Sequence, residues 1–104
     1  MTEIVMQQIK GRMVFMFEIK MGNLERSFKL AKEYNAKFVA VRIEMEGFPE
    51  AEVIINPIVN ADAKLEYYKK TYDDNLNHKY AKGIKIVGCT FGNDWNEIEE
   101  DLYY

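Results

Sequence analysis

Apolar residues alternate with other residues, or recur at helical spacing, along most of this chain. In "MVFMFEIK" (13–20) every second residue is apolar, which predicts a strand. The positions on its apolar face are Met13, Phe15, Phe17 and Ile19. The preceding "TEIVMQQI" (2–9) predicts an earlier strand that pairs with it, with Gly11 in the turn between them.

The first helix is predicted over "GNLERSFKLAKEYNAK" (22–37). The apolar residues at i, i+4 and i+7 are Leu24, Phe28 and Ala31. Asn23 is a favourable N-cap residue, and Asn35 can end the helix in a left-handed conformation.

Two strands are predicted to follow, separated by the turn "GFPE". "KFVAVRIEME" (37–46) alternates regularly, with Arg42 and Glu44 on the outward face. The inward positions are Val39, Val41, Ile43 and Met45. The short β-branched run "AEVIIN" (51–56) predicts the second strand of this pair.

The second half of the chain predicts another helix, a strand and a last helix. Residues 60–77 form the second long helix, capped by Asn60 or Asp62. Its apolar stripe is Leu65, Tyr68, Tyr72 and Leu76. "GIKIVGCTFG" (83–92) predicts a strand between two glycines, and the last helix begins at Asp94.

From residue 13 the predicted order is strand, helix, strand, strand, helix, strand and a terminal helix. This α+β order, βαββαβ, is that of the ferredoxin-like fold, with an extra N-terminal strand and a C-terminal helix. Another open antiparallel sheet with helices on one face is the alternative. Right-handed crossovers place both long helices on one face, and 104 residues suffice for a single α+β domain, 1–104. The residues expected to share its core are Phe28, Val41, Ile43, Tyr68 and Val87.

Composition is that of a folded globular protein, with 48% hydrophobic and 30% charged residues. No apolar run approaches the roughly 20 residues that cross a bilayer. The first residues lack the basic and then apolar pattern of a signal peptide. The single cysteine, Cys89, agrees with a reducing compartment. We therefore expect a cytoplasmic protein that does not engage a membrane.

The net charge is −3, but the charge is unevenly spread. The first 85 residues hold all 14 Lys and Arg and 12 of the 17 Asp and Glu, so the remaining residues hold five acids and no base. Bulk nucleic-acid binding needs a dense cationic surface. The strand at 51–56 also lacks the aromatic pair of an RNA-recognition motif. We expect no direct nucleic-acid binding.

The sequence contains no motif for catalysis or for a cofactor. It has no G-x-S-x-G, Walker A or G-x-G-x-x-G pattern. With one histidine, His78, and one thiol, Cys89, it lacks the ligands of a structural zinc site. Residues 73–78 begin like an EF-hand loop, but His78 stands where Gly is required. We therefore expect a protein that is not an enzyme and has no catalytic residue, metal or cofactor.

The last helix is both acidic and aromatic. Trp95, Ile98 and Leu102 are spaced like one apolar face. The acids of its second half lie where the helix dipole disfavours negative charge, so they form an outward face that either solubilises the domain or recognises a basic partner. The two terminal tyrosines fit a frayed end or an interface equally well. The residues expected in a partner contact are Trp95, Glu99, Glu100, Asp101, Tyr103 and Tyr104.

A second hypothesis is a small-ligand binder, for example a protein that sequesters a nucleotide signal in a pocket at a dimer interface. A phosphate group needs cations or free backbone N–H groups. The residues expected to bind such a ligand are Arg42, Lys82 and Lys85. A pocket lined by these three would favour this hypothesis.

The stretch "KLEYYKKTYDDNLNHKYAKGIKIVGCTFGNDWNEIEEDL" (64–102) resembles small uncharacterised proteins from phages and prophages of Gram-positive bacteria. Many small phage proteins bind and inhibit a host factor or a defence system. The resemblance therefore implies a phage-derived host-factor inhibitor or anti-defence protein in the cytoplasm of a bacterial host. The expected partner is a host protein with a basic surface. A homodimer is also expected, because open sheet edges tend to pair.

Overall fold

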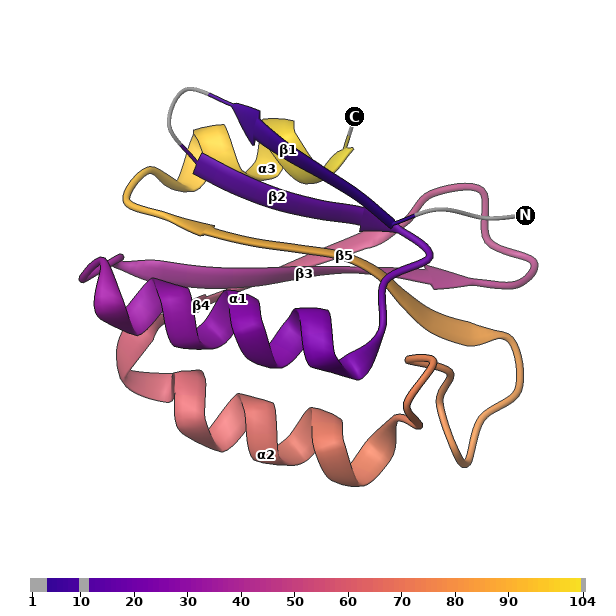
Figure 1. The fold of residues 1–104 in the computed structure, drawn as a ribbon. Helices are drawn as coiled ribbons and strands as arrows, with labels where there is room; N and C mark the ends of the chain where they lie inside the picture. The colour runs from indigo at the N-terminus through magenta and orange to yellow at the C-terminus, as the bar shows by residue number, and fades with distance from the viewer. Residues whose placement is uncertain (1–3, 10–11, 104) are drawn as a thin grey trace.

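The computed structural model describes residues 4–9 and 12–103, which form a sheet covered by helices (Figure 1). In chain order the elements are β1 (Ile4–Ile9), β2 (Arg12–Phe17), α1 (Met21–Glu33), β3 (Phe38–Met45), β4 (Glu52–Pro57), the 3₁₀ turn η1 (Ile58–Asn60), α2 (Ala61–Thr71), β5 (Ile84–Gly92) and α3 (Trp95–Tyr103). The predicted α+β class and βαββαβ order are confirmed, with the extra N-terminal strand and the C-terminal helix. The predicted turn at Gly11 lies outside the described residues.

The described strands form one sheet in the order β1-β2-β5-β3-β4, and every neighbouring pair is antiparallel. β5 pairs with β2 on one side and with β3 on the other. β5, the last strand in the sequence, therefore joins the β1–β2 pair to the β3–β4 pair. β4 takes the edge of the sheet beyond β3.

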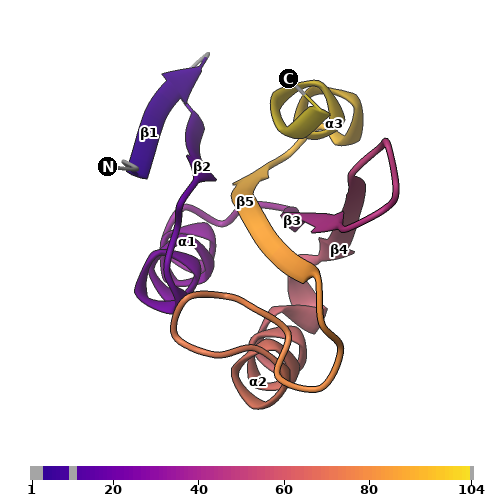
Figure 2. The ribbon, with the colours of Figure 1, turned by 90° about the vertical axis from the view of Figure 1, so that its right-hand side faces the viewer.

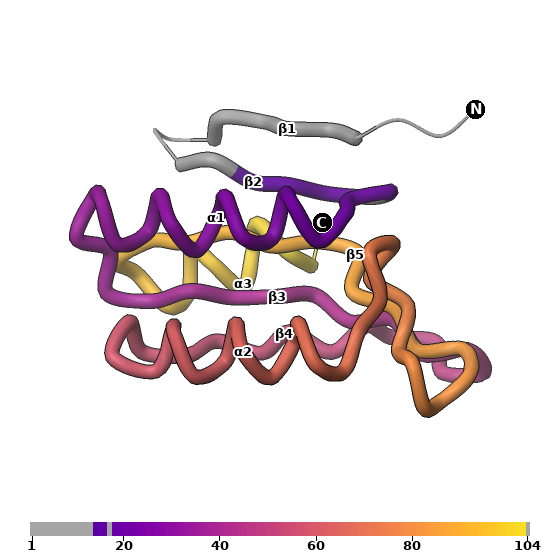
Figure 3. The backbone as a smooth tube through the Cα atoms, turned by 60° about the horizontal axis from the view of Figure 1, so that its bottom comes forward, coloured from indigo at the N-terminus to yellow at the C-terminus, as the bar shows by residue number. Residues whose placement is uncertain are grey.

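Helices cover both faces of this sheet. α1 and α2 lie on one face, as predicted for the two long helices, and α3 lies on the other (Figure 2). Figure 3 shows α1 and α2 in front of the sheet with α3 behind it. In the part of the chain that the structure describes, no helix is long and apolar enough to cross a bilayer.

The alternation of β3 builds a core on each face of the sheet. Its side chains buried beneath α1 and α2 are Val39, Val41 and Ile43, as predicted. Phe28 of α1 and Tyr68 of α2 belong to the same core, with ring centroids 6.3 Å apart and an angle of 87° between the rings. Ala40 points to the opposite face, where it packs with Ile98 and Leu102 of α3. β3 therefore contributes buried side chains to the core on each face of the sheet.

The structure corrects the prediction that Val87 belongs to the core. The pairing with β3 skips one residue of β5, because Arg42 is opposite Gly88 and the next residue of β3 is opposite Ile86. Val87 is therefore the extra residue of a β-bulge. Ile86 is buried in the core, whereas Val87 is half-buried and lines a surface hollow. A strict two-residue repeat fails here because the bulge reverses the alternation.

The second long helix is shorter than predicted, since α2 ends at Thr71. The carboxylate of Asp73 accepts hydrogen bonds of 2.9 Å from the backbone N–H groups of Asn75 and Asn77. This side chain closes a turn that competes with the helix. Leu76 has a left-handed backbone (φ 63°) and is fully buried in the core, although it is no longer helical.

Both ends of α1 are capped by the predicted asparagines, but the helix begins earlier than predicted. α1 begins at Met21, so Asn23 occupies its first turn and is not the N-cap residue. Asn23 still caps the helix, because its side-chain oxygen accepts a hydrogen bond of 2.8 Å from the backbone N–H of Lys20. Asn35 has the predicted left-handed backbone (φ 54°) just after the helix.

Candidate functional site

Two buried side chains anchor α3 to the sheet. Ile98 and Leu102 are both fully buried. The residues buried with them are Val14, Met16 and Ala40. Asp94, where the sequence predicts the helix to begin, caps it: its carboxylate accepts a hydrogen bond of 3.1 Å from the backbone N–H of Glu97. α3 is therefore a fixed platform for the side chains on its outer face.

A residue from the centre of the sheet stabilises the other end of α3. Arg42 Nη1 donates a hydrogen bond of 2.6 Å to the carbonyl of Leu102. Its Nη2 lies 3.3 Å from the carboxylate of Glu44. The last turn of α3 contains no basic residue, so Arg42 supplies the positive charge that the dipole favours at a helix C-terminus.

Two half-exposed aromatic side chains mark the outer face of α3. Trp95 is 47% exposed and Tyr103 is 45% exposed. The Trp95 ring meets Phe38 of β3 edge-to-face, with centroids 5.7 Å apart and an interplanar angle of 86°. Because Trp95, Glu99 and Tyr103 are four residues apart, they follow one stripe along the helix. Tyr104 lies outside the described residues.

The acids beside these aromatics differ in their surroundings. Glu100 is exposed and Glu99 is half-buried, and neither forms an ion pair with another described residue. Asp101 is half-buried and is engaged by a contact within the chain. The acidic aromatic face is therefore made by Trp95, Glu99, Glu100 and Tyr103.

The cations predicted to bind a ligand are only partly brought together. Arg42 and Lys85 line a surface hollow of about 510 Å³ beside the turn between β3 and β4, whereas Lys82 is not among the described residues that line it. Three carboxylates line the same hollow, from Glu44, Glu46 and Glu50. Among the described lining residues, acids therefore outnumber bases, which disfavours a phosphate-bearing ligand.

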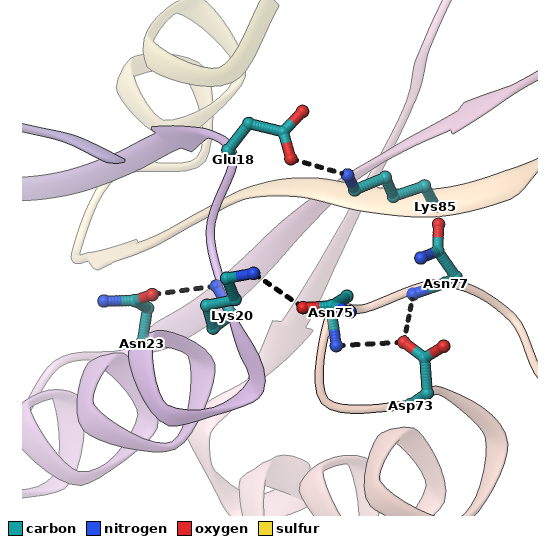
Figure 4. A network of polar contacts seen from close by, with 7 residues as sticks. All are labelled: Glu18, Lys20, Asn23, Asp73, Asn75, Asn77 and Lys85. Atoms are coloured by element: carbon teal, nitrogen blue, oxygen red, sulfur yellow. Dashed lines mark hydrogen bonds and ion pairs between the residues drawn. The ribbon is translucent and has the colours of Figure 1, made fainter. Parts of the chain in front are cut away.

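The ammonium group of Lys85 is already paired within the protein. It lies 2.9 Å from the carboxylate of Glu18, just after β2 (Figure 4). Beside this pair, Lys20 Nζ donates a hydrogen bond of 2.6 Å to the side-chain oxygen of Asn75, in the loop that Asp73 closes. The first contact ties β5 to the segment after β2, and the second ties the α2–β5 loop to the start of α1. Lys85 therefore has a structural role.

His78 and Cys89 also have structural roles. His78 Nδ1 accepts hydrogen bonds of 3.0 Å and 2.9 Å from the backbone N–H groups of Tyr80 and Ala81. Cys89 is fully buried, and burial raises the pKa of its thiol to about 12. Over residues 4–9 and 12–103, no group of three or more His, Cys, Asp or Glu could hold a metal ion.

Sequence reasoning missed two residues that position α3. Phe38 orients Trp95, and Arg42 holds the carbonyl of Leu102. A weak signal was present, because Phe38 and Ala40 occupy positions of β3 that alternation assigns to solvent, yet they are apolar. Such positions predict a second buried face of the sheet, although they do not identify the helix that covers it.

Comparisons with protein-family models, with curated proteins and with solved structures each found no match to this chain. The family of the chain is therefore not shown by similarity. The surface chemistry of α3 and its attachment to the sheet are the features from which a function can be inferred.

Proposed function

We propose that this protein is a non-enzymatic binding protein that acts by occupying the surface of another protein through the outer face of α3. The proposal rests on one observation: Glu99 and Glu100 lie beside two half-exposed aromatics on a helix that is firmly anchored to the sheet. Tyr and Trp dominate the binding energy of many protein interfaces. A fixed helix also loses little conformational freedom on binding.

The stability of the fold does not account for these acids. Negative charge near a helix C-terminus costs about 0.3–1 kcal/mol per site before screening. Neither Glu99 nor Glu100 recovers this energy through an ion pair with another described residue. Solubility would be served equally well by acids elsewhere, and it does not explain the exposed Trp95 beside them. Recognition of a partner explains both features.

The chemistry of this face suits a partner with a basic surface. Complementary charges steer two proteins together and disfavour partners of the wrong charge. We infer a host factor or a defence protein as the partner, which is what a relationship of residues 64–102 to small phage and prophage proteins would imply. The bacterial cytoplasm is then the place where the protein acts.

The alternative, a protein that sequesters a nucleotide signal, has weaker support. Arg42 and Lys85 line one hollow, but each is paired with an acid of the same chain. Lys82 is not among the described residues of that hollow. A phosphate group entering it would also meet carboxylates, so the arrangement opposes an anionic ligand.

A comparison of two charge-reversed variants tests the proposal. Glu99→Lys/Glu100→Lys reverses the outer face of α3. Glu33→Lys/Glu50→Lys is the matched control, because it changes the net charge equally at exposed acids of α1 and the β3–β4 turn. Immobilised wild type and control should capture the same protein from a lysate of a Gram-positive host, and the α3 variant should not.

Circular dichroism of each variant provides the folding control for this comparison. A folded α3 variant that captures the same protein as the wild type would contradict the proposal. The acids of α3 would then serve solubility alone.

A further inference from the structure

β4 is an edge strand, with β3 on one side (Figure 2). No described strand pairs with its other side. That side presents a row of backbone N–H and C=O groups that have no partner in the sheet, and such a row can serve as a template for a further strand.

The sequence of β4 contains none of the features that usually protect a free edge. Monomeric proteins blunt their edges with lysines, interior prolines or β-bulges. β4 reads EVIINP, so its proline is the last residue and its only charge is Glu52 at the start. Its register with β3 is continuous. Its half-buried apolar side chains are Val53, Ile54 and Ile55.

We propose that β4 pairs antiparallel with β4 of a second copy of this chain, about a two-fold axis at Ile54. In an antiparallel pair, residues directly opposite each other point to the same face. An axis at Ile54 therefore places Val53 opposite Ile55 and Glu52 opposite Asn56. An axis one residue later would place Val53 opposite Pro57, which has no N–H to donate.

The register at Ile54 makes a second copy a good partner for this edge. Apolar residues meet apolar residues at the centre of the pair. Each Glu52 carboxylate meets the carboxamide of Asn56, and no like charges are opposite each other. The two five-stranded sheets become one continuous sheet, with α3 on the same face in both copies. This inference does not depend on the proposed function of α3.

Charge changes at Asn56 test both the dimer and its register. The dissociation constant of the dimer is measured by sedimentation equilibrium. Asn56→Glu places a second carboxylate opposite Glu52 at both ends and should weaken the dimer about tenfold. Asn56→Lys places an ammonium group there and should tighten it about fivefold. The double variant Glu52→Lys/Asn56→Glu restores opposite charges and should return the dimer toward the wild-type affinity.

Urea unfolding of each variant separates weakened pairing from a damaged fold. Glu99→Lys/Glu100→Lys should dimerise like the wild type, which distinguishes pairing at β4 from self-association through α3. A wild type that stays monomeric at millimolar concentration would overturn the inference. A dimer that responds equally to Asn56→Glu and Asn56→Lys would overturn it as well.

Discussion

The guanidinium of Arg42, in the middle of β3, donates a hydrogen bond of 2.6 Å to the carbonyl of Leu102, 60 residues later in the chain. The bond joins a central strand to the last turn of an acidic helix. It places a positive charge where α3 has none of its own. The outer face of α3 therefore owes its fixed position to Arg42 as well as to the buried side chains beneath the helix.

Replacing Arg42 should loosen the end of α3. In Arg42→Met, the carbonyl of Leu102 loses a charge-assisted donor, and unfolding should become easier by about 1.5–3 kcal/mol. Hydrogen exchange should accelerate most at the backbone amides of residues 99–103. Urea unfolding and amide exchange measured by mass spectrometry or NMR check the two effects.

Glu44→Gln is the matched control, because it removes the negative charge of the other partner of Arg42 and leaves the bond to Leu102 in place. The Glu44 side chain is 55% exposed, so this change should cost less than about 1 kcal/mol. Unchanged amide exchange in Arg42→Met would show that Arg42 does not hold the helix end.

Two Val→Ala changes test where the core ends. Val41 is 1% exposed in the core, whereas Val87 is the half-buried residue of the bulge. Val41→Ala should lower the free energy of unfolding by about 2–3 kcal/mol, through lost burial and a cavity. Val87→Ala should lower it by less than about 1 kcal/mol. Equal losses in urea unfolding would contradict the bulge.

The thiol of Cys89 should make stability depend on pH in alkaline solution. Burial raises its pKa from the ordinary value of 9.0 to about 12. A pKa raised by folding stabilises the folded state below the unfolded pKa, and this stability is lost as pH rises from about 9 toward 12. Between about pH 8 and about pH 10.5, the thiol should account for a loss of about 2 kcal/mol. Burial also raises the pKa of Tyr68 and Tyr72, which act in the same direction above pH 10.0.

The variant Cys89→Ala isolates the contribution of this thiol. At pH 8 it should be less stable than the wild type, because the core loses the volume of the sulfur atom. Its further loss of stability up to about pH 10.5 should be smaller by about 2 kcal/mol. Urea unfolding at both pH values measures the difference. The same pH dependence in both proteins would contradict a buried, protonated thiol.

The order of the elements could be predicted from the sequence because local patterns define them. The alternation in β3 identified Val39, Val41 and Ile43 as core residues. The spacing in α3 identified Ile98 and Leu102 as buried, but it also placed Trp95 on their face, and Trp95 is 47% exposed. These patterns report which side of an element is apolar. They depend only on neighbours along the chain.

Most features that escaped prediction depend on contacts between residues that are distant in the sequence, whereas the end of α2 depends on a local contact. The end of α2 depends on the side chain of Asp73, which favours a turn over one more helical turn. The bulge at Val87 depends on how β5 fits β3. Arg42 looked like a free cation because its partner Leu102 is far away in the sequence. The predicted ligand site also did not assemble fully. Lys82 and Lys85 are close in the sequence, but of these two only Lys85 is among the described residues that line the hollow.

The rate at which the captured partner associates, measured at two ionic strengths, tests the central claim most directly. Because salt screens the steering by Glu99 and Glu100, wild-type association should slow at least about tenfold between about 0.01 M and about 0.1 M salt. The control Glu33→Lys/Glu50→Lys should show the same slope. Folded Glu99→Lys/Glu100→Lys should associate slowly at both salt concentrations. A variant with reversed α3 charges that binds as fast as the wild type, with the same dependence on salt, would contradict the claim that α3 is the contact surface.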